Sequence, residues 1–457
     1  MHHFMDVGFI HGSKFDITKN FEGVNLMKGF SSWVKEIQDV KQTSYKFANL
    51  SEEVLNELLK SIKEKLMMYK KEIFSANKKD IILAKKKNLS KALVDRLTLS
   101  EKRFDEMLSG IDTVVSLSTP INKIISQWER EIKGNKFTIK KVCVPLGVVC
   151  MIYESRPNVT IDATVLCIKS GNCVILRGGS ETINTNKFLV KTIKLAIDDV
   201  WQKFNLDFSK DVVLFIDEPS YDLLYKILQL DKYIDLVIPR GSEKMVDAIK
   251  AKSKIPVLSH GSGVCHTYVD KDADIDIAIK VCLNAKVQRP AVCNAMETLL
   301  VHKDIADKFL PKIAKIYQEH NVELRGCKKT VDLLKKHGIK VKQAKEIDWF
   351  TEYLDYILSI KIVNNIDEAI YHINHYGSHH SDAIITKDKT AQVKFEQEID
   401  SSAVFINSST RLHDGGVFGF GTEIGISTSK LHARGTMGLN ELTTTKYVVE
   451  GNGAIRE

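Results

Sequence analysis

The stretch Ser170-Gly171-Asn172-Cys173-Val174-Ile175-Leu176-Arg177-Gly178-Gly179-Ser180-Glu181 reads as a turn, a short buried strand, two glycines and the beginning of a helix. In sheets of parallel strands, ligands bind beyond the carboxyl ends of the strands. Two glycines let the backbone approach a phosphate closely, and an arginine beside them can pair with it. Because a Gly-Gly pair at a strand end is more often an ordinary turn, the stretch indicates a fold more strongly than a ligand.

Short runs of branched apolar residues alternate with helical stretches along most of the chain. The predicted strands are residues 173–176, 212–216, 234–238, 298–301, 383–385 and 403–406. Regular alternation of strand and helix predicts an α/β fold in which helices cover parallel sheets. Residues 131–144 and the threonine-rich residues 443–453 break this rhythm. We expect both segments to form an extended arm outside the main sheets.

The bulk properties restrict the class of protein. With 457 residues the chain exceeds the size at which one hydrophobic core keeps growing, so we expect at least two domains. A composition of 44% hydrophobic and 27% charged residues is that of a soluble globular protein, and the longest apolar run, residues 142–153, is too short for a membrane span. The eight cysteines have neither metal-ligand nor disulfide-framework spacing, and no secretory leader is recognisable. We therefore expect reduced thiols, a cytoplasmic location and no membrane contact.

The formal charge of +8 comes mostly from lysines spread over helical stretches, which is typical of solvated helix faces. No aromatic-studded basic motif accompanies them, so we expect no nucleic-acid binding. Residues 1–40 show no sustained periodicity and are interpreted as an N-terminal extension. From Ser51, which can cap a helix, apolar residues follow helical spacing and predict an amphipathic helix.

A candidate nucleophile lies in Asn284-Ala285-Lys286-Val287-Gln288-Arg289-Pro290-Ala291-Val292-Cys293-Asn294-Ala295. This stretch follows an amphipathic helix that begins near Asp274 and precedes the predicted strand at Thr298. Pro290 is expected to end the helix, which leaves Cys293 on a connection, where reactive groups are usually displayed. Arg289 would favour its thiolate form. Taken alone, a single cysteine is more often a small buried hydrophobic residue.

Four histidines, His372, His375, His379 and His380, raise the question of a metal site. The first two lie three residues apart on a predicted helix, but no carboxylate or cysteine completes a recognisable ligand set. We therefore expect no metal site.

Taken together, these stretches resemble the gamma-glutamyl phosphate reductase family of the aldehyde dehydrogenase superfamily. The resemblance runs in order from about Ser44 to the C-terminus. The motifs that carry it are residues 153–159 (YESRPNV), 170–172 (SGN), 176–179 (LRGG), 238–242 (IPRGS), 288–294 (QRPAVCN), 407–411 (NSSTR), 414–416 (DGG), 418–421 (FGFG), 423–428 (EIGIST) and 432–435 (HARG).

The resemblance implies an aldehyde-dehydrogenase-like fold, with two Rossmann-like parallel-sheet domains and an extended β oligomerisation arm. The implied division is an NADP-binding domain at residues 41–128 and 142–260, a catalytic domain at residues 261–436, and the arm at residues 129–141 and 437–457. The implied cofactor contacts are Arg177, Gly178, Gly179, Ser180, Gly241, Ser242 and Glu352. An uncharged Ser180, where NAD-preferring relatives often place a carboxylate, favours NADP.

The resemblance also implies the chemistry. Cys293 would attack the acyl phosphate of L-glutamyl 5-phosphate, phosphate would leave, and hydride from NADPH would reduce the thioester to L-glutamate 5-semialdehyde, a step of proline biosynthesis. The amide of Asn158 and the backbone N–H of Cys293 are candidate oxyanion donors. By charge and position, Ser155, Arg156, Arg289 and Arg434 are assigned to the substrate. The resemblance also implies that the chain forms a homo-oligomer. It implies a functional coupling to glutamate 5-kinase, whose product would be the substrate.

Two other enzyme classes remain open at this point. Aldehyde-oxidising relatives need a glutamate that activates water, but the corresponding residues 258–263 (LSHGSG) hold no carboxylate, which disfavours that class. A cysteine hydrolase that pairs Cys293 with a histidine such as His260 would turn over without any nicotinamide. A catalytically silent member is disfavoured by the presence of Cys293, Arg177 and Glu352.

Overall fold

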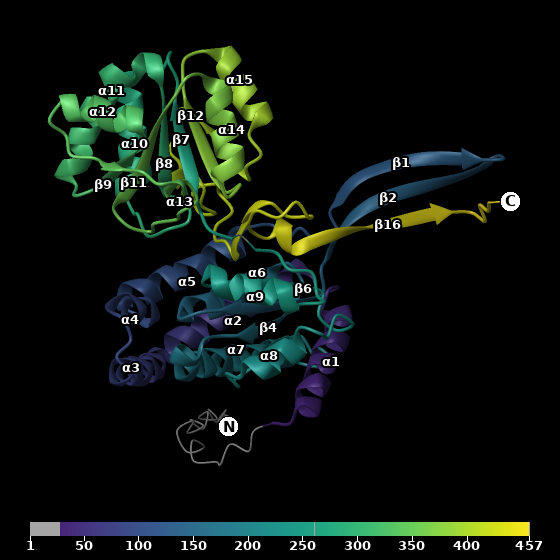
Figure 1. Ribbon diagram of the computed structural model, residues 1–457. Coiled ribbons are helices and arrows are strands. Elements are labelled where there is room, and N and C mark those ends of the chain that lie inside the picture. Colours follow the sequence, from purple (N-terminus) through teal and green to yellow (C-terminus); the bar gives the residue numbers. More distant parts are fainter. Residues whose placement is uncertain (1–27, 260, 457) are drawn as a thin grey trace, which may run out of the picture.

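The computed structural model describes residues 28–259 and 261–456. Two α/β units lie one above the other, and a long β arm projects sideways from between them (Figure 1). The resulting α/β fold, with parallel sheets in both units and an antiparallel arm, confirms the predicted fold class. Within the described part of the chain, no helix combines the length and the apolar character that a membrane crossing needs.

The first unit is built on a four-stranded parallel sheet with the strand order β5-β4-β3-β6. Its strands are β3 (Val148–Tyr153), β4 (Cys173–Arg177), β5 (Val213–Phe215) and β6 (Leu236–Arg240). Its helical elements are α1 (Phe30–Phe47), α2 (Glu52–Met68), α3 (Lys70–Lys86), α4 (Lys91–Leu97), α5 (Glu101–Ser116), α6 (Pro157–Lys169), η2 (Ser180–Thr182), α7 (Ile183–Lys203), α8 (Tyr221–Ile227) and α9 (Glu243–Lys252). Strands β3 and β4 are buried along their whole length, as expected for a parallel sheet covered on both faces.

Helices of this unit pack against one another and against the sheet. Helices α6 and α7 pack against each other, α2 packs on both of them, and α1 crosses β3, β4 and β5. Ser51 caps α2 as predicted, since its hydroxyl accepts a hydrogen bond from the Val54 N–H.

The N-terminal boundary differs from the prediction of an extension over residues 1–40. Helix α1 already begins at Phe30, and Trp33, Ile37 and Val40 are buried in the core of the first unit. These residues form a helical stripe, but the polar residues between them dilute the periodicity along the sequence. Residues 1–27 lie outside the described residues.

The second unit is built on a seven-stranded parallel sheet with the order β10-β9-β11-β8-β7-β12-β13. Its strands are β7 (Cys265–Val269), β8 (Met296–His302), β9 (Glu323–Gly326), β10 (Lys342–Gln343), β11 (Ile357–Val363), β12 (Ser381–Ile385) and β13 (Ala403–Ile406). Its helical elements are α10 (Ile275–Val287), α11 (Lys303–Glu319), α12 (Lys328–Lys336), α13 (Glu346–Trp349), α14 (Ile366–Tyr376), α15 (Lys389–Glu398) and η3 (Thr410–Leu412). Alternate residues of β8 enter different cores: Leu299 and Val301 face one, and Leu300 faces the other.

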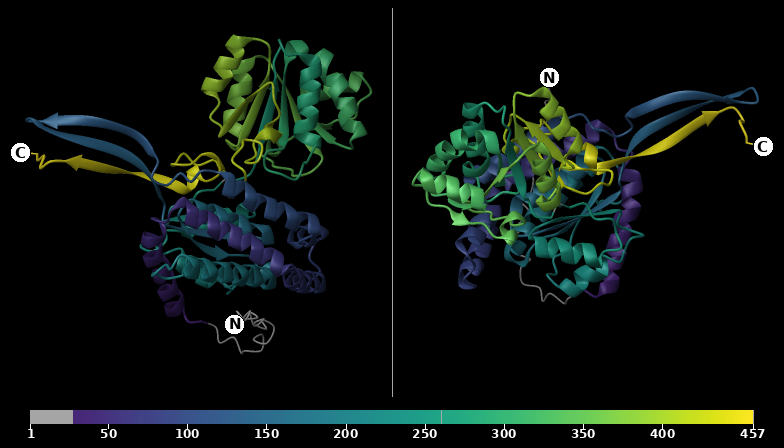
Figure 2. Two further views of the ribbon diagram at one scale, coloured as in Figure 1. Left: turned by 180° about the vertical axis from the view of Figure 1, so that it is seen from behind. Right: turned by 45° about the horizontal axis from the view of Figure 1, so that its top comes forward.

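The arm is a three-stranded antiparallel sheet of β1 (Ile124–Ile132), β2 (Asn135–Pro145) and β16 (Thr443–Gly451). Strand β16 runs beside β2 although some 300 residues separate them, as both views of Figure 2 show. The β1–β2 hairpin turns through Lys133 and Gly134, which both have positive φ, as a tight two-residue turn requires. Both segments that broke the sequence rhythm therefore lie in this sheet.

The remaining C-terminal elements are β14 (Gly425–Ser427), β15 (Gly435–Met437) and η4 (Asn440–Leu442). Residues 407–442 lie between the two units (Figures 1 and 2) and contact both. The Asn294 side-chain amide donates to the His413 carbonyl at 3.0 Å, and Arg240 Nη1 donates to the Ile424 carbonyl at 3.1 Å. This segment brings the carboxyl end of β6 close to the connection that follows α10.

Candidate active site around Cys293

The connection between α10 and β8 carries Cys293. Asp274 caps α10, because its Oδ1 accepts hydrogen bonds from the N–H groups of Asp276 and Ile277. The helix ends at Val287, before Pro290, and β8 begins at Met296. Cys293 lies on the turn between them and is partly exposed, as its sequence context predicted.

Two residues of the β7 region hold the backbone of Cys293. A side chain at Gly263 could not fit, since its Cβ would lie 2.7 Å from the Cys293 Cα. The Cys265 thiol donates to the Cys293 carbonyl at 3.2 Å. A glycine backbone, rather than a carboxylate side chain, therefore occupies the space immediately beside the main chain of Cys293.

The charges around Cys293 come from both units and from the C-terminal segment. Burial raises the pKa of its thiol to about 11, and Arg240, at the end of β6, opposes this rise most strongly. Glu352 and Glu423 add to the rise in the thiol pKa through their negative charges. Sequence reasoning assigned the activating charge to Arg289, but Arg240 is the cation with the largest effect.

Three further arginines gather at this place. Burial, together with repulsion from Arg240, Arg96 and Arg289, lowers the pKa of Arg156 to about 10. Burial and the charge of Arg289 also lower the pKa of Arg411. Arg411 Nε donates to the side chain of Gln288 at 2.9 Å, and its Nη1 donates to Asn294. Arg156, Arg289 and Arg411 thus form a cationic cluster beside Cys293, which we call the arginine cluster.

A second group of predicted residues lies at the carboxyl end of β4. Arg177 is buried, its guanidinium lies 5.4 Å from the centre of the Tyr221 ring, and its Nη2 donates to the Pro219 carbonyl at 3.0 Å. Its buried Nε has no hydrogen-bond partner among residues 28–259 and 261–456. Gly178 has no space for a side chain because Asn186 fills it, and Ser180 is exposed.

Gly241 and Ser242 form the N-terminus of α9. The Glu154 carboxylate accepts hydrogen bonds from the Ser242 N–H at 3.0 Å and from the Ser242 hydroxyl at 3.2 Å. A carboxylate is stabilised at this position by the positive end of the helix. Glu154 thus occupies the place where an anionic group of a ligand would bind.

A cavity of about 240 Å³ lies between α8 and α9. It is lined by Glu154, Tyr221, Leu224, Tyr225, Ser242, Lys244, Met245, Ala248 and Ile249. Its walls are mostly apolar and aromatic, its rim holds the α9 N-terminus, and Arg177 stacks on its Tyr221. An apolar slot, a helix N-terminus and a cation with an unpaired N–H are features that suit an aromatic ring and a phosphate of a dinucleotide.

Glu352 lies on the loop between α13 and β11 and joins the site from the second unit. The pKa of its carboxyl group is raised by burial, although a hydrogen bond from the Gly263 backbone opposes part of this rise. Since its charge also acts on the Cys293 thiol, the structure brings this predicted cofactor contact close to the predicted nucleophile.

Of three other predicted residues, two have side-chain partners of their own. Ser155 is buried and has a φ of +40°, a strained conformation for a serine. The Asn158 side-chain amide donates to the Asp162 carboxyl group at 2.8 Å. Arg434 forms an ion pair at 2.9 Å with Asp400, which also pairs with Lys430. The assignment of Arg434 to the substrate stays a prediction.

Sequence reasoning did not single out Arg240, Arg411 or Glu423. Each lies inside a motif that carried the family resemblance, at residues 238–242, 407–411 and 423–428, and this could have drawn attention to them. Glu423 accepts a hydrogen bond from the Gly415 N–H at 2.9 Å, and burial raises the pKa of its carboxyl group.

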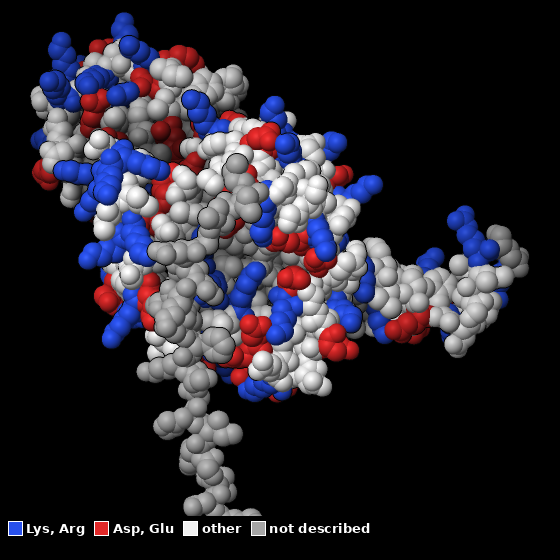
Figure 3. Space-filling model, turned by 90° about the horizontal axis from the view of Figure 1, so that it is seen from below, with Lys and Arg blue, Asp and Glu red and all other residues white. Residues whose placement is uncertain are grey.

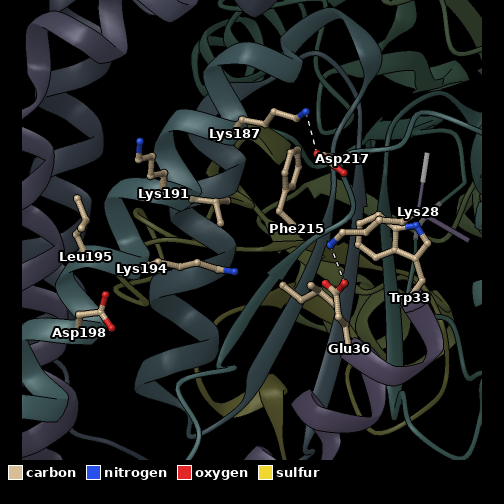
Figure 4. A pocket seen from close by; sticks show the side chains of 12 residues that line it. Lys28, Trp33, Glu36, Lys187, Lys191, Lys194, Leu195, Asp198, Phe215 and Asp217 are labelled. Carbon is tan, nitrogen blue, oxygen red and sulfur yellow. Dashed lines mark hydrogen bonds and ion pairs between the residues drawn. The ribbon is translucent and has the colours of Figure 1, made fainter. Parts of the chain in front are cut away.

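Charges of both signs are mixed over the surface away from this site. Lysines and arginines are interspersed with aspartates and glutamates over the face shown in Figure 3. A cavity of about 310 Å³ at the β5 edge of the first unit is lined partly by lysines. Figure 4 shows that Lys28 pairs with Glu36 and Lys187 with Asp217, at 2.6 and 2.8 Å.

The histidines of α14 belong to a packed cluster. His372 is buried with its ring against those of Trp349 and His266. Among the described residues, no group of three or more His, Cys, Asp or Glu side chains is arranged to hold a metal ion.

The class of this protein follows from two parallel-sheet units with Cys293 between them. One of the units also has a slot suited to a dinucleotide. A model of the aldehyde dehydrogenase family matches residues 47–332, more than half of the chain. The chain therefore belongs to the aldehyde dehydrogenase family, whose members are oxidoreductases that use nicotinamide cofactors.

Its similarity to particular members is much closer. The gamma-glutamyl phosphate reductase of Thermodesulfovibrio yellowstonii is 50% identical over 424 residues, which cover 93% of this chain and 98% of that protein. The enzyme of the same name from Petrotoga mobilis is 49% identical over 423 residues, with the same coverage. The crystal structure of gamma-glutamyl phosphate reductase from Thermotoga maritima is 43% identical, covers 93% of this chain and 99% of its own, and superposes with a TM-score of 0.88. Within the family, the chain groups with the gamma-glutamyl phosphate reductases, which confirms the resemblance seen in the sequence.

Proposed function

We propose that this protein reduces L-glutamyl 5-phosphate to L-glutamate 5-semialdehyde and phosphate, with NADPH as the reductant, in proline biosynthesis. The observation that carries the proposal is the position of Cys293 at the junction of the two units, between the arginine cluster and the loop of Glu352. The names of relatives that are about half identical over almost the whole chain support the same reaction.

In this proposal Cys293 is the nucleophile. Its thiolate attacks the acyl carbon, the bond from carbon to the phosphate oxygen breaks, and phosphate leaves with the electron pair, which produces a thioester. With Arg240 already opposing the effect of burial, the thiol has a pKa of about 11 and is mostly protonated before substrate binds. The attack therefore uses the small thiolate fraction, which the charge of Arg240 stabilises.

The arginine cluster is the proposed anion site of the substrate. L-Glutamyl 5-phosphate carries a phosphate and an α-carboxylate, and guanidinium groups bind both kinds of anion through paired hydrogen bonds. Arg156 and Arg289 keep this role from the sequence prediction, and the structure adds Arg411 to them. Glu423 is the candidate partner for the α-ammonium group, because it is a partly buried carboxylate whose charge acts on Cys293.

NADPH, when bound, supplies the hydride that reduces the thioester carbon. Arg177, Gly178, Gly179, Ser180, Gly241, Ser242 and Glu352 are the residues that we propose hold it. The unpaired Nε of Arg177 and the uncharged, exposed Ser180 favour a 2′-phosphate over a free ribose hydroxyl. The Cys293 N–H and the Asn158 amide are the proposed donors to the oxyanion, and the aldehyde is released when the carbon–sulfur bond breaks and the thiol is restored.

We also propose the assembly and location of the enzyme. The arm exposes Ile124, Ile125, Trp128, Ile132, Tyr447 and Val449, a set that a second copy of the chain could cover, and we infer a homo-oligomer. The division into an NADP-binding domain (residues 41–128 and 142–260), a catalytic domain (residues 261–436) and an arm (residues 129–141 and 437–457) stays our proposal. All eight cysteines are free thiols, which favours a reducing cytoplasm. The labile acyl phosphate must come from a kinase, glutamate 5-kinase.

The test is NADP reduction at 340 nm with glutamate semialdehyde, with and without phosphate, for the wild type and for Cys293→Ala. We expect phosphate-dependent activity with NADP that is lost in the variant. Activity without phosphate would make the protein an aldehyde-oxidising dehydrogenase. Activity that survives Cys293→Ala would exclude the proposed mechanism.

A further inference from the structure

A buried ion pair lies directly behind the connection that carries Cys293. Lys286 is in the last turn of α10, and Glu297 is the second residue of β8. Lys286 Nζ lies 2.5 Å from Glu297 Oε2, and both side chains are fully buried. Because the two residues flank the Cys293 connection, their contact closes that connection at its base.

Glu297 makes a second contact, which reaches the loop of Glu352. Its other carboxylate oxygen accepts a hydrogen bond from the Leu354 N–H at 3.2 Å. Leu354 has a φ of +52°, which is strained for a branched side chain and persists only where surrounding contacts impose it. Glu297 supplies one of those contacts, and Leu354 lies two residues after Glu352.

The surroundings of Lys286 reinforce the same loop. Its ammonium group lies 6.0 Å from the centre of the Tyr353 ring. The Tyr353 hydroxyl is bound at 2.9 Å to Asp348 and at 2.8 Å to Ser359. The pair therefore contacts the two residues that follow Glu352 in the chain, Tyr353 through its ring and Leu354 through a backbone hydrogen bond.

Stability alone does not explain a pair of this kind. Burial lowers the pKa of Lys286 and raises the pKa of Glu297 to about 7, and each partner opposes the shift of the other. Replacing a buried ion pair with apolar residues of similar volume is often neutral or stabilising, because the desolvation of two charges is removed. Apolar residues would, however, leave the Leu354 N–H without its acceptor.

We propose that the Lys286–Glu297 pair is a positioning device that holds the Cys293 connection and the Glu352 loop in one fixed relation. The inference rests on the roles proposed for Cys293 and Glu352. Neither Lys286 nor Glu297 touches substrate; they act through the two loops that do. Loss of the pair should therefore impair nucleophile and cofactor site together, although these belong to different loops.

The experiment compares the full-length wild type with Lys286→Met/Glu297→Leu and with the isosteric Glu297→Gln. Fluorescence titration gives the Kd of NADPH, iodoacetamide alkylation from pH 7 to 10 gives the reactivity of Cys293, and the NADP assay gives kcat. We expect about tenfold weaker NADPH binding, a changed alkylation profile and a kcat at least about tenfold lower in the double variant. Glu297→Gln should show the same changes in smaller size, since it keeps an acceptor oxygen but loses the charge.

A matched control separates position from stability. Lys169 is also fully buried and paired, with Glu52 at 2.8 Å, but in the first unit away from both loops. Lys169→Met should lower the melting temperature without changing the Kd of NADPH or the alkylation profile. Should the double variant aggregate, Glu297→Gln decides the question.

Wild-type binding and alkylation in folded Glu297→Gln and in any folded double variant would overturn the inference. The binding and alkylation measurements use no glutamate semialdehyde. Failure of the wild type to bind NADPH would therefore refute the proposed function instead, so the two failures are distinguishable.

Discussion

Replacing Arg240 with methionine should slow the reaction of Cys293 with iodoacetamide. Arg240 is the cation that most strongly stabilises the Cys293 thiolate, and it reaches the site from the end of β6 in the other unit. Methionine keeps much of the volume of the side chain and removes its charge. The variant therefore tests whether the thiolate depends on a residue that lies far from Cys293 in sequence.

The expected size follows from the thiol pKa of about 11. An opposite charge at close range lowers a pKa by about 1 to 3 units, and its loss reduces the thiolate fraction about tenfold for each unit. A more basic thiolate is intrinsically more nucleophilic, which returns about threefold for each unit. The net fall in the alkylation rate is therefore about three- to fortyfold at any pH well below the thiol pKa.

The assay follows labelling of Cys293 by mass spectrometry at several pH values between 7 and 10, without cofactor. In the wild type the logarithm of the rate should rise with pH throughout this range, because deprotonation is incomplete below the thiol pKa. Arg240→Lys, which keeps the charge, should retain most of the rate, and Arg130→Met on the arm should leave it unchanged. A wild-type rate that is level above pH 8, or an Arg240→Met profile identical to the wild type, would refute the reasoning.

Two other expectations concern the cofactor and the stability. Glu154→Gln should lower the Kd of NADPH about two- to tenfold, because the carboxylate that now occupies the α9 N-terminus competes with an anionic ligand; a higher Kd in fluorescence titration would contradict this. His372 is buried, and burial together with neighbouring His266 and Lys361 lowers its pKa to about 2, so its contribution to stability is complete above pH 6.5 and is lost as the pH falls toward 2. Between pH 6.5 and 4.5, the free energy of unfolding of His372→Phe should consequently fall by about 2 to 3 kcal/mol less than that of the wild type, as measured by urea unfolding. Equal falls in the two proteins would show that His372 titrates normally.

Much of the local structure could be predicted because its causes are local. The branched run at residues 173–176 forms β4, Asp274 caps α10, and Pro290 follows the helix end and leaves Cys293 on a connection. Of the two glycines after Arg177, Gly178 is sterically required, because Asn186 leaves no space for a side chain there. Each of these signals acts within a few residues, so sequence is sufficient to find it.

Other elements could not be found in this way. Strand β9 is only Glu323–Gly326, with the sequence ELRG, and its pairing with β10 and β11 makes it a strand. The apolar stripe of α1 is recognisable as a buried helix face only because Trp33 packs in the core of the first unit. Such elements owe their conformation to neighbours that are distant in sequence.

The sequence by itself determined the family, the α/β class, the exposed connection that carries Cys293 and the strand end that holds Arg177. Only the tertiary structure decided which charges act on Cys293 and on the other predicted residues: Arg240 rather than Arg289 has the largest favourable effect on the thiolate, Glu154 occupies the α9 N-terminus, and Arg434 pairs with Asp400. The physical reason is the range of the interactions. Periodicity, capping and turns act between near neighbours in the chain, whereas electrostatic interactions depend on distances that exist only after the two sheets have docked.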